Sequence, residues 1–287
     1  MSSEEDGPPV EILTVAQAGG SSHAGMFATR DIRHEEEIFY ENPFLEQEEG
    51  FAFRRPEMQH DPKARLLQRR LEEFSHKYSH LPHGHPNKYP PEARAVMDQL
   101  CDLGQAFAYQ ELSPSNKTKY VALADCFRKI SANAPVIITG LASEAGKQLN
   151  GLSGIASSFD KDTDRWAVLL PDGHGKKIKC ENLKTPGGIW RTNVFSFKTG
   201  GTEVLFENLS RINHSCVPNV IKQRFDCDGE FGEFVVTAMR DISAGEELFI
   251  DYGVPQASVD VRRAWLEMKY NFMCQCPACD EESHTPR

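Results

Sequence analysis

Three cysteines near the C-terminal end of the sequence have the spacing of metal ligands. Cys274, Cys276 and Cys279 lie within six residues, in the pattern Cys-x-Cys-x-x-Cys. Three thiolates this close together can surround one tetrahedral Zn²⁺ ion, which then needs one further ligand. The alternative is a chance cluster of thiols. A disulfide framework is not expected, because the N-terminal sequence lacks the apolar core of a secretory signal and the compartment should therefore be reducing.

A second segment with reactive side chains is Asn213-His214-Ser215-Cys216. Cys216 could act as a thiolate nucleophile with His214 as its base, which is the chemistry of a cysteine hydrolase. Two residues apart on one strand, these side chains would face the same side, but so close a pair rarely has a productive geometry. The hydrolase stays open as an alternative, and it requires a reactive thiol at Cys216.

Taken together, three segments resemble the SET-domain protein methyltransferases. They are residues 211–219, which contain Asn-His-Ser-Cys, residues 245–253, with the sequence Gly-Glu-Glu-Leu-Phe-Ile-Asp-Tyr-Gly, and the C-terminal cysteine cluster. Their combination and order are specific, although each segment alone is not. The resemblance covers residues 9–45 and about 187–279, and it points to the branch with a split SET domain, that of the SET-and-MYND proteins.

The resemblance implies a binding site for S-adenosylmethionine. In the glycine-rich turn that binds this cofactor, His23 replaces the usual first glycine and Gly25 remains. Asn213 matches the residue at the methionine and ribose side, and His214 matches one that meets the adenine largely through its backbone. The residues that the resemblance assigns to the cofactor are Ala24, Gly25, Met26, Phe27, Asn213, His214, Tyr252 and Phe272.

The resemblance also assigns a catalytic residue and completes the metal site. Tyr252 matches the tyrosine at the methyl-transfer pore, and Phe272 matches the aromatic residue that packs on adenine. Cys216 matches the fourth zinc ligand, beside the three cysteines of the C-terminal cluster. Four cysteines leave no open coordination position, so the Zn²⁺ is expected to be structural and to hold Phe272 over the cofactor.

The implied activity is the transfer of a methyl group from S-adenosylmethionine to a lysine side chain of a protein, histone or non-histone. This in-line displacement needs a neutral lysine nitrogen aligned with the methyl group. A tyrosine hydroxyl and backbone carbonyls can orient the amine, and desolvation in a narrow channel lowers the pKa of the lysine. The alternative is a catalytically silent SET scaffold that acts as a protein-binding module.

The sequence departs from the SET-and-MYND pattern in two places. The zinc finger between the SET halves is absent, since that region holds only Cys101, Cys126 and Cys180 and no Cys-x-x-Cys pair. The long helical C-terminal extension is also missing, because the sequence ends eight residues after Cys279. We therefore expect a more open substrate groove than in that branch.

Short strands at both ends of the sequence must position these residues. β-Prone runs predict strands at residues 10–15, 26–28 and 37–40. Residues 30–39 and 240–249 repeat one pattern, Arg-Asp-Ile followed by Glu-Glu and two apolar residues, at the same spacing. Two such strand–turn–strand units far apart in the sequence indicate one β-domain interrupted by insertions.

Between these units, the hydrophobic pattern predicts helices and then a small β module. Apolar residues at helical spacing predict helices over residues 62–80, from Pro91 onward and from Tyr120 to Ile130. From residue 135 the pattern changes to four short strands, with turn signals at Asn150-Gly151 and Asp172-Gly173. This module is similar to the small barrels of the Tudor type.

We therefore expect an α+β protein, mainly β: a split SET domain with a helical insert, a small inserted β-barrel and a zinc-binding post-SET segment. The predicted parts are residues 9–45, the N-terminal part of the SET domain; 46–134, the helical insert; 135–186, the Tudor-like barrel; 187–253, the C-terminal SET core; and 254–287, the post-SET zinc segment.

The predicted barrel has no single expected role. Phe159 and Trp166 would supply two aromatic residues of a methyl-lysine cage, which binds by cation–π attraction, but Trp166 alternates with apolar residues that face a core. A protein or nucleic-acid contact through Lys176, Lys177 and Lys179 is the second interpretation. A structural spacer is the third.

Composition and charge limit the class of partner. The 287 residues are 39% hydrophobic and 26% charged, which is ordinary for a globular protein, and no apolar run approaches the roughly 20 residues of a membrane span. We expect no membrane contact and an intracellular location, in the nucleus or the cytoplasm. The net charge of −10 disfavours a nucleic-acid coat and favours a basic partner, such as a Lys/Arg-rich tail that presents the substrate lysine.

Overall fold

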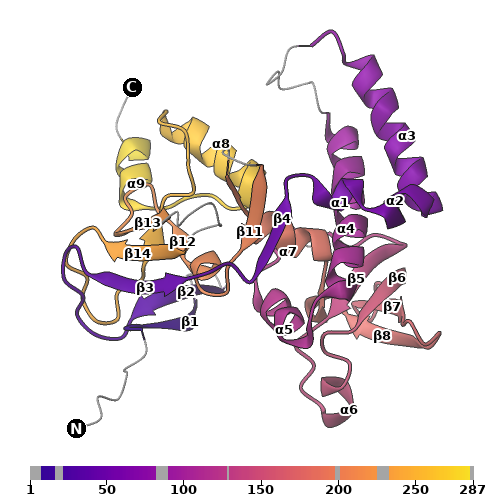
Figure 1. The fold of residues 1–287 in the computed structure, drawn as a ribbon, viewed down its shortest axis with the longest axis horizontal. Helices are drawn as coiled ribbons and strands as arrows, with labels where there is room; N and C mark the ends of the chain where they lie inside the picture. The colour runs from indigo at the N-terminus through magenta and orange to yellow at the C-terminus, as the bar shows by residue number, and fades with distance from the viewer. Residues whose placement is uncertain are drawn as a thin grey trace. The chain divides into compact units, whose positions relative to one another are not determined.

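The computed structural model describes residues 8–16, 22–81, 90–127, 129–197, 201–224 and 233–284. It divides into two compact units, Met1–Leu45 with Val204–Arg287, and Glu46–Glu203 (Figure 1). The described ranges contain fifteen strands and nine α-helices. Within them, no helix combines the length and the apolar character that crossing a membrane requires. The first acidic residues of the sequence and the side chain of His23 lie outside the description. The predicted division into five parts, from the N-terminal SET segment at residues 9–45 to the post-SET segment at 254–287, stays a prediction.

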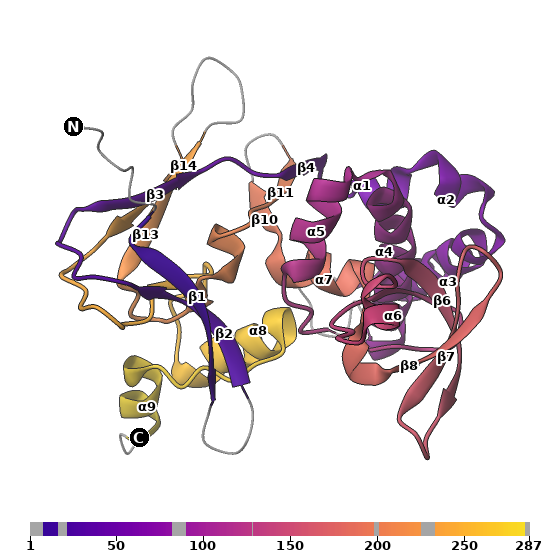
Figure 2. The ribbon, with the colours of Figure 1, turned by 90° about the horizontal axis from the view of Figure 1, so that it is seen from below.

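Strands from both ends of the sequence build the first unit. β1 (Val10–Ala16) and β2 (Ser22–Ala28) form an antiparallel pair. A second, antiparallel sheet has the order β13-β14-β3, with β3 at Glu37–Glu41, β13 at Val220–Arg224 and β14 at Phe234–Ala238. β14 and β3 therefore lie side by side although they come from opposite ends of the chain (Figure 2).

The other elements of this unit belong to the C-terminal half of the sequence. β12 (Asn213–His214) pairs in parallel with β15 (Phe249–Ile250). A short 3-10 turn at Leu209–Arg211 precedes β12, and the helices α8 (Val259–Tyr270) and α9 (Pro277–His284) follow β15. The parallel pair and the two helices surround the segments in which the sequence places its chemistry.

The two copies of the repeated pattern, residues 30–39 and 240–249, pair with each other and make the same hydrogen bonds in both directions. The N–H of Ile32 donates to the carbonyl of Ile242 at 2.8 Å, and the N–H of Ile242 donates to the carbonyl of Ile32 at 2.9 Å. The aspartates are equally reciprocal: the N–H of Ala244 donates to Asp31 Oδ1 at 2.9 Å and the N–H of His34 to Asp241 Oδ1 at 2.8 Å.

The second unit begins with helices. α3 (Pro62–Lys77) packs against α4 (Pro91–Glu111), and each has proline at its first turn, where the missing N–H is not needed. The side chain of Asp61 caps α3 by accepting from the N–H of Ala64 at 2.8 Å. The apolar side chains buried between these helices are Met58, Ala64, Leu67, Val96, Leu100 and Leu103. The shorter helices are α1 (Phe51–Arg54), α2 (Pro56–His60), α5 (Pro114–Ala122), α6 (Glu144–Lys147) and α7 (Pro186–Asn193).

The predicted helix from Tyr120 to Ile130 is wrong beyond its first three residues, because α5 ends at Ala122. Beyond this end, the N–H of Cys126 donates to the side chain of Thr192 on α7 at 3.0 Å. A tertiary partner, rather than the preceding turn of helix, satisfies this backbone group. The apolar stripe therefore continues without helical structure.

An antiparallel sheet of order β8-β7-β6-β5-β9 completes the second unit. Gly151 and Gly173 both have a φ of 84°, which favours glycine and agrees with the predicted turns. The five strands are β5 (Ala134–Ile138), β6 (Ser153–Asp160), β7 (Arg165–Leu169), β8 (Gly175–Lys179) and β9 (Leu183–Lys184), one more than predicted. A separate three-stranded sheet has the order β10-β11-β4, with β10 at Phe195–Phe197, β11 at Thr202–Leu205 and β4 at Leu45–Glu48.

Trp166 belongs to the core of the five-stranded sheet. Its side chain is packed with Val136 and Val168, whereas Phe159 is exposed, with the two ring centroids 5.2 Å apart. Lys177 and Lys179 each face an acidic neighbour at 3.2 Å. Barrel closure and any partner of this module stay predictions.

The reciprocal pairing generates a stability prediction. Ile32 and Ile242 are both only 1% exposed, so Ile32→Ala and Ile242→Ala should each lower the free energy of unfolding by about 2–5 kcal/mol. Urea unfolding followed by circular dichroism measures this, with the exposed neighbour variant Arg33→Ala as the control. A loss below 1 kcal/mol for both isoleucine variants would contradict the role assigned to the pairing.

Candidate functional site

Tyr252 follows the parallel strand pair of the first unit. β12 supplies Asn213 and His214, and β15 leads directly into the tyrosine. The Tyr252 hydroxyl donates to the carbonyl of Ile212 at 2.9 Å, and its ring lies 5.2 Å from the ring of His214, centroid to centroid. The hydroxyl is therefore held by the residue just before β12, and the ring lies beside a residue of β12. The strand pair brings together three of the residues that the sequence assigns to a cofactor.

Asn213 connects β2 to the segment before β15. Its side-chain amide donates to the carbonyl of Ala24 at 2.9 Å and to Glu247 Oε1 at 2.7 Å. A Cβ atom added to Gly25 would lie 2.1 Å from the same carboxylate oxygen. The close approach that demands a glycine here is therefore made by the side chain of Glu247.

Glu247 is absent from the residues that the sequence assigns to the site. Two signals point to it: its place in the 245–253 segment and its place in the repeated pattern, where Glu37 occupies the matching position. Because its carboxylate fixes the amide of Asn213, Glu247 is part of the site as the structure describes it. Met26 and Phe27 follow Gly25 in the sequence, but their side chains are buried. They can therefore offer mainly backbone groups to a cofactor.

Aromatic side chains join the C-terminal segment to this site. The ring centroid of Phe272 lies 6.3 Å from that of His214, and the centroid of Tyr270 lies 4.6 Å from that of Tyr252. Trp265 on α8 extends the cluster, 5.9 Å from Tyr270. Aromatic pairs at these distances attract each other beyond their burial. Tyr270 and Trp265 were not singled out from the sequence, because their types and spacing are equally typical of core packing.

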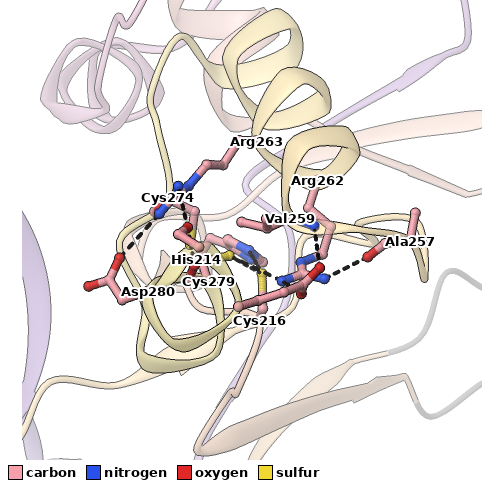
Figure 3. Close-up of polar contacts among 11 residues, drawn as sticks. His214, Cys216, Ala257, Val259, Arg262, Arg263, Cys274, Cys279 and Asp280 are labelled. Carbon is pink, nitrogen blue, oxygen red and sulfur yellow. Dashed lines mark hydrogen bonds and ion pairs between the residues drawn. The ribbon is translucent and has the colours of Figure 1, made fainter. Parts of the chain in front are cut away.

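The four cysteines form one cluster. The sulfur atoms of Cys216, Cys274, Cys276 and Cys279 all lie within 4.8 Å of one another. Figure 3 shows three of these residues, Cys216, Cys274 and Cys279, and the sulfur atoms of Cys216 and Cys279 are 3.6 Å apart. A tetrahedral Zn²⁺ with Zn–S bonds of about 2.3 Å requires sulfur–sulfur separations of roughly 3.8 Å. The donor set and its spacing therefore fit a structural zinc ion.

The environment of the cluster affects how readily the thiols ionise. Burial raises the pKa of the Cys274 thiol to about 11. Burial also opposes ionisation of Cys276, but hydrogen bonds from the backbone N–H groups of Cys279 and Cys216, together with those from the thiols of Cys274 and Cys279, lower its pKa to about 7. Metal binding requires thiolates, so the hydrogen bonds to the sulfur of Cys276 act in the same direction as a bound cation would.

His214 contacts one sulfur of the cluster, that of Cys216; whether the two form a productive catalytic pair stays a prediction. Its Nε2 lies 3.4 Å from Cys216 Sγ. The contact arises because β12 ends at His214 and Cys216 lies in a bend rather than on the same strand. The same sulfur faces the other three cysteines, which favours a metal ligand over a nucleophile.

Comparison with known proteins identifies the fold. The family model described as "SET domain" matches residues 23–253, which is more than half of the chain. The chain belongs to the SET-domain family. The SET-domain resemblance found in the sequence is thereby confirmed, together with a SET fold of mixed helices and strands.

Relatives of this SET-domain chain include enzymes named for histone methylation. The "Histone-lysine N-methyltransferase SET5" of Yarrowia lipolytica is 41% identical over 73 residues, covering 25% of this chain and 16% of the relative. The protein of the same name in Meyerozyma guilliermondii is 37% identical over 125 residues, covering 44% and 24%. A "SET and MYND domain-containing protein" of Dictyostelium discoideum is 32% identical over 111 residues, covering 39% and 24%. The chain thus spans a quarter or less of the length of these relatives.

The packing of Gly25 against Glu247 generates a double-variant prediction. Gly25→Ala should displace the carboxylate, break its bond to Asn213 and lower the free energy of unfolding by about 1–3 kcal/mol. In a Glu247→Ala background the same Gly25→Ala change should have less than half this effect, because the added methyl group then has room. Urea unfolding of the four proteins checks this. Equal losses in the two backgrounds would show that Glu247 is not what requires the glycine.

Proposed function

We propose that this chain is an S-adenosylmethionine-dependent protein-lysine N-methyltransferase. The observation that carries the proposal is the meeting of Asn213 and Tyr252 at the β12–β15 pair of a SET-domain chain, with the tyrosine hydroxyl held on the carbonyl of Ile212. The naming of relatives as histone-lysine N-methyltransferases supports the same reaction. A catalytically silent scaffold is not favoured, since the residue types of the pore are present and ordered around one strand pair.

The cofactor is proposed to lie against β2, β12 and the post-SET segment. Asn213 and the backbone of residues 24–27 would bind its methionine and ribose side, and His214 and Phe272 would enclose its adenine. When bound, S-adenosylmethionine supplies the electrophilic methyl group. Glu247 orients the amide of Asn213, and its negative charge favours a cofactor that carries a positively charged sulfonium.

Tyr252 is proposed to orient the substrate lysine. Its hydroxyl oxygen can contact the lysine amine, while the Ile212 carbonyl holds the hydroxyl proton. Exclusion of water from the pore favours the neutral form of the lysine, which is the form that accepts a methyl group. These groups position the amine and stabilise the positive charge that develops on it.

The substrate class follows from charge. The first unit contains 23 acidic and 10 basic residues, a net charge of −13, whereas the second contains 19 acidic and 22 basic residues, a net charge of +3. A strongly acidic SET unit attracts basic protein segments and speeds their association. We propose a protein substrate that presents a lysine within a basic segment, histone or non-histone, in the nucleus or the cytoplasm.

The cysteine cluster is proposed to hold one structural Zn²⁺ through Cys216, Cys274, Cys276 and Cys279. The four sulfur atoms fill its coordination, so the metal cannot activate water. Cys274 and Phe272 are two residues apart and pack in the same apolar cluster as Tyr252. The metal therefore acts on the active site by fixing the segment that carries Phe272.

The proposed reaction predicts a selective effect of Tyr252→Phe. Loss of the hydroxyl should reduce methyl transfer by roughly 100-fold, because the hydroxyl acts mainly in the transition state. Affinity for S-adenosylmethionine should stay within a few-fold, since the ring is retained. Transfer is measured on histones and whole-cell extract with mass spectrometry of the modified lysine, and affinity by calorimetry.

Tyr40→Phe, which removes an exposed hydroxyl in the same unit, is the matched control and should keep full activity. Unchanged turnover of Tyr252→Phe would remove this tyrosine from the pore. A wild-type protein that binds the cofactor but transfers no methyl group to any protein would instead support the silent scaffold.

The proposed zinc site predicts one zinc ion per chain in freshly purified protein. Cys276→Ser should lose the metal and, with it, binding of S-adenosylmethionine, because the segment carrying Phe272 is no longer held. Elemental analysis and calorimetry measure the two effects. Cys126→Ser, which changes an exposed cysteine outside the cluster, should keep both. Zinc-free wild-type protein with normal cofactor binding would refute the site.

A further inference from the structure

Two consecutive arginines on α8 face the cysteine cluster and make different contacts with it (Figure 3). Arg262 Nη2 lies 3.5 Å from the sulfur of Cys279. The contacts of Arg263 go to other atoms: its Nε donates to the backbone carbonyl of Cys274 at 2.9 Å, and its Nη2 pairs with Asp280 at 3.1 Å. One arginine thus touches a ligand atom, and its neighbour touches the backbone and the side chains around it.

The guanidinium of Arg262 is held in place from several directions. Its Nη1 donates to the carbonyl of Ala257 at 2.6 Å, and its Nη2 pairs with Glu282 Oε2 at 2.9 Å. The other oxygen of Glu282 accepts from the N–H of Val259 at 2.8 Å, in the first turn of α8. Glu282 on α9 therefore satisfies the start of α8 and fixes the arginine at the same time. A side chain constrained in this way is pre-organised to donate to one sulfur.

The contact of Arg262 with the Cys279 sulfur can compensate negative charge on the cluster. Four thiolates around one Zn²⁺ carry a net charge of −2, and the cluster is packed against the buried side chains of Val259 and Leu266. Charge in such an apolar surrounding is unfavourable unless it is compensated by an opposite charge or by hydrogen bonds. Arg262 places a positive charge within hydrogen-bond distance of a ligand sulfur, and its side chain is only 14% exposed.

We propose that Arg262 is a positioning residue of the metal site, which donates an N–H···S hydrogen bond to the Cys279 thiolate, partly neutralises the four-thiolate cluster and slows release of the metal. This inference rests on the proposed zinc site and deepens it. Arg263 has a different role, that of holding the backbone between the second and fourth cysteines. Partners of this kind around metal ligands typically contribute a factor of 10–100 in metal affinity.

The test uses the full chain and three variants, Arg262→Gln, Arg262→Lys and Arg263→Gln. Zinc release into excess chelator is timed with a colorimetric zinc indicator. The same proteins are loaded with Co²⁺, and the sulfur-to-cobalt charge-transfer band is recorded. This band reports electron density on the sulfur atoms, and a general loss of stability does not move it.

Arg262→Gln should release zinc at least 10-fold faster than the wild type, and its cobalt band should move to longer wavelength because the thiolate has lost a charged donor. Arg262→Lys keeps the charge and a donor. Its zinc release rate and its cobalt band should therefore stay close to those of the wild type. Arg263→Gln should leave the band unchanged, even where zinc release is faster.

An unchanged band and a release rate within threefold of the wild type in Arg262→Gln would overturn the proposal, as would an equal band shift in Arg263→Gln. Should Arg262→Gln fail to fold, Glu282→Gln removes the anchor of the guanidinium and should shift the band in the same direction, and an unshifted band would again overturn it. Wild-type protein that binds neither zinc nor cobalt would refute the zinc site itself, a failure that is distinct from that of Arg262.

Discussion

The reciprocal pairing of residues 30–39 with residues 240–249 is the constraint on which the rest of the first unit depends. It sets the register between β2 and the segment that enters β15, with Phe27 bridged to Glu247. Because side chains alternate along extended backbone, this register turns Glu247 toward Gly25, and a shift of one residue would turn it away. The same pairing also positions β15 beside β12. It thereby positions Tyr252, which follows β15.

The sequence predicts structural features that arise from neighbouring residues better than features that depend on contacts between distant segments. Trp166 was placed correctly on a core-facing strand, because alternation along β7 is a local pattern. The end of α5 was missed because the partner of Cys126 is Thr192, far along the chain. Glu247 was missed for the same reason, since its role exists only once β2 lies beside it. The SET-domain motifs were found because their order is specific, although no spacing could give the contacts among them.

The cysteine cluster and the strand-pair site share one apolar core. Cys274 and Cys279 are packed together with Tyr252, Tyr270 and Phe272 in a single cluster of side chains. Packed interiors have few voids, so a displacement of the ligands is transmitted to the aromatic rings beside them. The proposed zinc ion, although it would take no part in the chemistry, would in this way help to form the aromatic side of the site.

The partners in the reciprocal pairing are 207 and 213 residues apart in the sequence. A ribosome adds roughly 5–20 residues per second, so the second copy of the pattern is synthesised roughly 10–40 s after the first. During this interval β2 and β3 have no native neighbours from the C-terminal half, while the entire second unit emerges. Unpaired strand edges are open to wrong partners. The nascent N-terminal strands are thus exposed to mispairing during this interval, and a second chain in close proximity can supply the missing segment by domain swapping.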